Sequence, residues 1–119
     1  MNNQVYWMLE LEIQQGREQD FRALMKEMVE ATRDDEPETL AYEWSTSGDG
    51  RRCHIFERYA DSAATMKHLA NFGEKFATRF LDVLSPTSFV VYGSPSQEVK
   101  DALVAFGAAY MQPADGFIR

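Results

Sequence analysis

Two hydrophobic periodicities alternate along the chain, and their order limits the possible folds more than any other feature. Residues 5–13 place apolar side chains at every second position, which is typical of a strand with one buried face. From residue 21 the apolar positions follow helical spacing. That helix is expected to end in the acidic run before Pro37, because proline disfavours helical geometry in the residue that precedes it.

Two further strands are expected at residues 40–46 and 52–59, joined by a hairpin. The Asp-Gly pair at positions 49–50 favours a type I′ turn, in which both central residues take a positive φ. This turn would set Tyr42 opposite Glu57 and place both side chains on the same face of the hairpin.

A second helical region is expected from an N-cap at Asp61 to about Leu84, with a break near Gly73 and a stop at Pro86. Residues 88–92 then form a fourth strand. The order β-α-β-β-α-β is that of the ferredoxin-like α+β fold, an antiparallel sheet with its helices on one face.

We divide the chain into a ferredoxin-like domain at residues 1–93 and a C-terminal helix and arm at residues 94–119. The run Ser-Pro-Ser-Gln from residue 94 predicts a capping box, with proline at the first helical position. The apolar residues beyond Gly107 need a surface to pack on, which is either their own domain or a dimer partner.

The sheet face away from the helices is expected to mix apolar and acidic side chains. It would carry Tyr6, Met8, Ala41, His54, Phe56 and either Phe89 or Val90, among Glu10, Glu12 and Glu43. Such a face is too apolar for water and too polar for the core of a monomer. We therefore expect two copies to pair through it as a homodimer.

Charge and cysteine usage exclude several classes of protein. The chain has 19 acidic and 12 basic residues and a net charge of −7, so it lacks the basic surface that binding to nucleic acid or an anionic membrane requires. One cysteine, Cys53, in an apolar strand pattern indicates a buried thiol in a reducing compartment. Because no signal-peptide pattern or membrane-length apolar stretch is present, we expect a cytoplasmic protein.

Glu57 and His68 are the candidate catalytic residues. Glu57 is predicted on the helix-covered face, where a buried carboxylate needs a partner. His68, at the edge of the next helix's apolar stripe, is one candidate, and an imidazole oriented by a carboxylate is a common general base. The alternative is a half-exposed His68, with Glu57 paired to an arginine. Three aromatic residues on the strands have two interpretations, as the wall of a pocket or as ordinary core residues. They are Tyr42, Trp44 and Tyr59.

Metal and nucleotide chemistry have no support in the sequence. Two histidines and one cysteine occur without HxH, HxxxH or CxxC spacing, so no metal site is expected. The glycine-rich phosphate-binding patterns and the GxSxG elbow are also missing from the sequence.

Three parts of the sequence resemble the antibiotic biosynthesis monooxygenase (ABM) family of dimeric α+β barrels. They are the run Leu40-Ala41-Tyr42-Glu43-Trp44, the run from Ile55 to Ser62 and the following His68. The resemblance covers roughly residues 4–93. It implies a ferredoxin-like homodimer with one pocket per subunit, between sheet and helices. Several members of that family oxidise quinols or polycyclic phenols with O₂ and without metal or flavin.

By this resemblance His68 would be a base or an orienter, Glu57 its electrostatic partner, and Tyr42, Trp44 and Tyr59 the pocket wall and hydrogen-bond donors. The implied function is a monooxygenase that needs no cofactor and acts on a quinol-like or polycyclic aromatic molecule. The alternative is a non-catalytic dimeric barrel that binds a small molecule or serves as an accessory subunit, because one fold hosts several functions.

Overall fold

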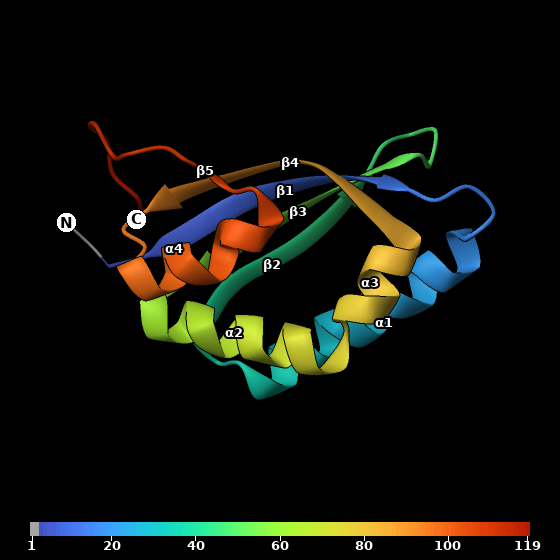
Figure 1. Ribbon diagram of the computed structural model, residues 1–119, viewed down its shortest axis with the longest axis horizontal. Helices are drawn as coiled ribbons and strands as arrows, with labels where there is room; N and C mark the ends of the chain where they lie inside the picture. Colours follow the sequence, from blue (N-terminus) through green and yellow to red (C-terminus); the bar gives the residue numbers. More distant parts are fainter. Residues whose placement is uncertain (1–2) are drawn as a thin grey trace.

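The computed structural model describes residues 3–119 and confirms the predicted β-α-β-β-α-β order. The elements are β1 (Val5–Ile13), α1 (Glu18–Asp35), β2 (Thr39–Thr46), β3 (Arg52–Tyr59), α2 (Ser62–Lys75), α3 (Ala77–Val83), β4 (Leu84–Gly93), α4 (Gln97–Leu103), a 3₁₀ turn η1 (Val104–Phe106) and β5 (Ala109–Tyr110). Helices α1, α2 and α3 lie together on one side of the sheet (Figure 1).

The sheet has the strand order β2-β3-β1-β4-β5. Its first four strands are antiparallel in the ferredoxin-like arrangement, which confirms the predicted fold class. The short β5 adds to the edge of β4 in parallel, and the sequence analysis did not predict it. The sheet is therefore mixed, because the C-terminal segment returns along β4.

The β2–β3 hairpin has the predicted register, with Tyr42 opposite Glu57. The predicted type I′ turn is wrong, because Gly50 takes a positive φ of 72° and Asp49 does not. The Asp49 carboxylate instead accepts hydrogen bonds from the Ser47 hydroxyl at 2.6 Å and from the Arg51 N–H at 3.0 Å. These local bonds stabilise a different turn with the same strand pairing.

Two predicted boundaries around α3 are wrong. The helical region breaks at Phe76 and not at Gly73, and β4 begins at Leu84, so Pro86 lies inside a strand. β5 pairs with β4 only at Val90 and Val91. Pro86 is therefore on a free edge of β4, where a strand tolerates a residue without an N–H donor.

The helix of the C-terminal segment, α4, packs on the core of its own domain. This helix starts two residues later than predicted, because Ser96 is the N-cap and accepts a hydrogen bond from the Val99 N–H at 3.2 Å. Val99 and Leu103 are fully buried in a core cluster with residues of β1, β3 and β4. Beyond α4, Met111 and Phe117 are exposed.

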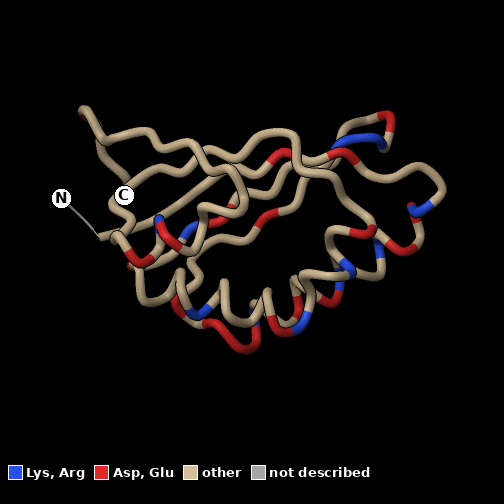
Figure 2. Tube along the Cα trace, in the orientation of Figure 1, with Lys and Arg blue, Asp and Glu red and all other residues tan. Residues whose placement is uncertain are grey.

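The two faces of the sheet differ as expected. Cys53 is free and buried on the inner face, where burial raises the pKa of its thiol to about 12. Val90, and not Phe89, lies on the outer face, since Phe89 is buried against Trp7. Charged residues are frequent along the helices and at the hairpin, and residues 102–114 carry none (Figure 2). Within residues 3–119, no helix combines the length and the hydropathy that crossing a bilayer requires.

Candidate functional site

An apolar cavity of about 510 Å³ lies between the inner face of the sheet and the helices. Its walls are mostly aliphatic and aromatic, and they include Trp7, Leu9, Ile55, Leu69, Phe72, Phe80 and Phe89. Three polar side chains reach the lining of this cavity, those of Tyr42, Glu57 and His68, beside the indole of Trp7. A volume of several hundred cubic ångströms is typical of a site for a small organic molecule.

His68 is held between two carboxylates, and we call Glu36, His68 and Glu57 the triad. The imidazole Nδ1 is 2.8 Å from Glu36 Oε1, and the Nε2 is 3.2 Å from Glu57 Oε1. The three residues are only 4–5% exposed. The pairing of Glu57 with His68 is the one that the sequence analysis offered as a candidate, and the half-exposed alternative for His68 is wrong.

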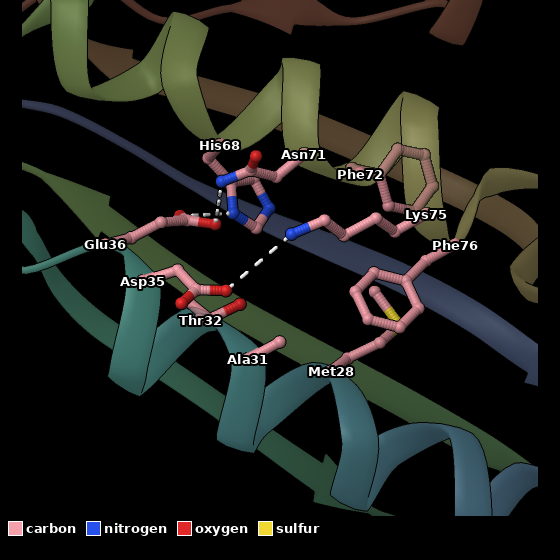
Figure 3. A pocket seen from close by; sticks show the side chains of 10 residues that line it. All are labelled: Met28, Ala31, Thr32, Asp35, Glu36, His68, Asn71, Phe72, Lys75 and Phe76. Atoms are coloured by element: carbon pink, nitrogen blue, oxygen red, sulfur yellow. Dashed lines mark hydrogen bonds and ion pairs between the residues drawn. The ribbon is translucent and has the colours of Figure 1, made fainter.

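Three different elements position the triad. The hairpin register directs Glu57 inward from β3. His68 lies on α2, which Asp61 starts by accepting a hydrogen bond from the Ala64 N–H at 2.8 Å. Glu36 is the C-cap of α1, and its side chain reaches His68 across the space between α1 and α2 (Figure 3).

Further hydrogen bonds fix the Glu36 carboxylate. The Thr39 hydroxyl donates to Oε1 at 2.9 Å, and the Asn71 amide donates to Oε2 at 3.2 Å. Burial acts to raise the pKa of Glu36, but the hydrogen bond and charge of His68, with those of Asn71 and Thr39, lower it overall. Glu36 is therefore ionised at neutral pH.

The two carboxylates also set the charge of His68. Burial acts to lower the pKa of His68, but its hydrogen bonds and charge interactions with Glu36 and Glu57 raise it to about 9. At neutral pH the ring is thus an imidazolium, which donates a proton from each nitrogen. An imidazolium has no lone pair with which to accept a further proton.

This charge state predicts how stability depends on pH. Because the pKa of His68 is raised from 6.5 to about 9 on folding, its stabilising contribution is complete below the unfolded value and is lost as pH rises through about 9. The loss amounts to roughly 3 kcal/mol in the free energy of unfolding. Urea unfolding between about pH 6 and about pH 9.5 measures it, and His68→Gln should remove most of this dependence. Equal pH dependence in both proteins would contradict the assignment.

Glu57 is the member of the triad with an oxygen left for a ligand. Its Oε1 accepts hydrogen bonds from both Tyr59 Oη and His68 Nε2, and its side chain lines the cavity. Neither of these two donors occupies Oε2. The two donors on Oε1 stabilise a negative charge on this carboxylate.

The structure brings some of the predicted aromatic residues to the cavity and leaves others outside its lining. Tyr42 lines the cavity, with its ring centroid 5.4 Å from that of His68. Burial and the charge of Glu57 raise the pKa of Tyr42 well above its usual value, so its hydroxyl stays neutral. Tyr59 is fully buried behind Glu57. Trp44 is not among the lining residues and packs against Phe21 and Phe80.

The sequence analysis missed Glu36, although a signal was present. The buried positions of α1 include Met28 and Thr32, and Glu36 is one further step of four residues along the same stripe. The sequence analysis placed it only in the acidic run before Pro37, at the end of the helix. In residues 3–119 no group of three or more His, Cys, Asp or Glu side chains has the geometry to hold a metal ion.

The fold and the triad together define a class, a ferredoxin-like α+β domain with a buried acid–base group at an apolar cavity. The sequence model of the family "Antibiotic biosynthesis monooxygenase" matches residues 5–77. That match covers more than half of the chain and includes all three residues of the triad. The chain belongs to the antibiotic biosynthesis monooxygenase family.

Solved structures show the same fold. MupZ from Pseudomonas fluorescens superposes with a TM-score of 0.85 at 24% identity, covering 99% of this chain and 96% of MupZ. SnoaB from Streptomyces nogalater, a cofactor-independent oxygenase, has a TM-score of 0.65 at 12% identity, covering 79% of this chain and 95% of SnoaB. Comparison with curated protein sequences gave no significant match.

Proposed function

We propose that this protein is a cofactor-independent monooxygenase that oxidises a quinol-like or polycyclic aromatic molecule with O₂. The observation that supports it most is the geometry of the triad, in which one carboxylate, held by Tyr59 and an imidazolium, lines a mostly apolar cavity. Family membership and the likeness to SnoaB favour oxygenation over other uses of such a site.

In the proposed reaction Glu57 Oε2 takes a proton from the substrate. The resulting aromatic anion is electron-rich and reduces O₂ directly, so the substrate supplies all the electrons. For a ring methylene flanked by aromatic rings, the balance is R₂CH₂ + O₂ → R₂C=O + H₂O, with one oxygen atom in each product. His68 keeps the Glu57 carboxylate in place, and the apolar walls exclude water from the anion.

Oxygen uptake by the purified protein tests this proposal. A panel of quinols, anthrones and naphthols is offered with and without a chelator, and product is analysed for incorporation of ¹⁸O. The expected result is uptake of O₂ that the chelator does not change, with one labelled oxygen atom in the product. Uptake that depends on added metal, or the absence of uptake with every compound bound, would contradict the proposal.

A binding role without turnover is the second candidate. It is favoured by the fact that both nitrogens of His68 and the Oε1 of Glu57 already have partners within the protein. These three atoms are therefore hydrogen-bonded without a substrate. This candidate predicts saturable binding of aromatic compounds and no consumption of O₂.

We also propose that the outer face of the sheet pairs two copies of the chain. Met8, Phe56 and Val90 are only half-buried there, and Tyr6 stacks on Tyr92 with centroids 5.5 Å apart. Sedimentation should give twice the chain mass of 13.6 kDa, and Phe56→Lys should give a monomer. Ala23→Lys, on the exposed side of α1, adds the same charge and should remain dimeric. A monomeric native protein would contradict the proposal.

A further inference from the structure

The cavity is built from two separate parts of the chain. Tyr42, Glu57 and His68 lie within the 5–77 segment that matches the family. Leu103, Ala105 and Phe106 also line the cavity, and they lie well beyond that segment. The polar residues of the cavity therefore lie within the segment that matches the family, and this part of the wall lies outside it.

The wall residues belong to a turn that is fixed at both ends. Before the turn, Leu103 is 1% exposed in the core. After it, Gly107 takes a φ of 68° and turns the chain toward β5, where the Met111 N–H donates to the Val91 carbonyl at 2.9 Å. Packing on either side thus determines where η1 lies.

Phe106 sits at the boundary between the cavity and solvent. It lines the cavity and is nevertheless 40% exposed. Its ring centroid is 6.4 Å from that of Phe72, which lies one helical turn beyond His68 on α2. The neighbouring Val104 is 75% exposed and is not among the lining residues. Phe106 is therefore the large side chain of η1 that lines the cavity and also reaches solvent.

The charges around the cavity also select the kind of ligand. The triad combines two carboxylates and one imidazolium, so it presents a net negative charge. Residues 102–114, on the C-terminal side, contain no charged side chain. A buried anion would find no free cation along this wall, and burying an unpaired charge is costly.

We propose that Phe106 determines substrate length, and that the cavity selects neutral molecules with one hydroxyl at the triad and an apolar body that ends against this ring. The inference rests on the proposed use of the cavity as the substrate site. It assigns the chemistry to the segment shared with the family and the selection by length to the C-terminal turn.

A series of 4-alkylphenols tests the inference by binding alone. Displacement of the neutral fluorophore N-phenyl-1-naphthylamine gives the affinity for each tail length. Affinity should rise by about fourfold for each added methylene while the tail is buried, and then level off where the tail passes Phe106. Phe106→Ala should move this limit to longer tails by at least two methylenes, and Phe106→Trp should move it to shorter ones. 4-Octylbenzoate should bind at least tenfold more weakly than 4-octylphenol.

Val104→Ala is the matched control, because it shortens a neighbouring side chain of the same turn. It should leave the limit unchanged, and thermal melting confirms that each variant is folded. An unchanged limit in Phe106→Ala, an equal shift in Val104→Ala, no binding of any alkylphenol, or tighter binding of the benzoate would overturn the inference. If the tail-length limit depends on Phe106 but no compound of the panel gives O₂ uptake, the inference is upheld and the proposed oxygenase function is refuted. If the panel gives O₂ uptake but Phe106→Ala leaves the tail-length limit unchanged, the proposed function is upheld and the inference is refuted.

Discussion

Glu57→Gln is expected to lower kcat by about 10²–10⁴-fold, the range that a general base contributes, while the cavity still binds aromatic ligands. The amide keeps the size of the side chain and still accepts the hydrogen bonds of Tyr59 and His68. It cannot accept a proton from the substrate. Oxygen uptake gives kcat with a substrate found by the panel, and ligand displacement gives the affinity.

Glu43→Gln is the control for this substitution. Glu43 lies on the partner strand of the same hairpin, with an exposed side chain, and its replacement should leave kcat unchanged. A Glu57→Gln protein that retains kcat within about threefold, a change of less than 1 kcal/mol in the barrier, would show that the carboxylate is not the base.

His68→Ala is expected to lower the free energy of unfolding by about 3–5 kcal/mol, because it leaves charges buried without their counterion. The carboxylates of Glu36 and Glu57 would remain buried without the imidazolium that lies between them. Urea unfolding at neutral pH measures the loss. A protein as stable as the native chain would contradict the buried, charged triad.

His54→Ala is the matched control, since it removes the other histidine. His54 Nε2 is 3.5 Å from Glu10 Oε1, and both side chains are nearly half exposed. Exposed pairs of this kind contribute about 0–1 kcal/mol. The contrast between the two histidines therefore isolates the effect of burial between two carboxylates.

The sequence was sufficient for the fold because each strand and helix has its own periodicity. The hairpin pattern placed Tyr42 opposite Glu57, and the helical stripe placed His68 near the same face. Pro86 and Gly73 were misleading, since proline is tolerated on the free edge of β4 and glycine did not break α2. Local patterns therefore predicted the elements better than their ends.

The site was predicted less completely because two of its parts depend on tertiary packing. Glu36 contacts His68 only because the end of α1 packs near α2, 32 residues further along the chain. Phe106 reaches the cavity only because Val99 and Leu103 anchor α4 on the domain core. Neither contact follows from residue spacing within a single element.

The most direct test of the proposed site is to measure the charge of His68 in the native protein. The chain has only two histidines, so ¹⁵N-labelled histidine gives two sets of ring signals, which His68→Gln assigns. At about pH 7.5 both ring nitrogens of His68 should carry a proton, and the ring should titrate near its pKa of about 9. A neutral His68 ring at that pH, with one nitrogen unprotonated, would contradict the account and would make the imidazole itself the base.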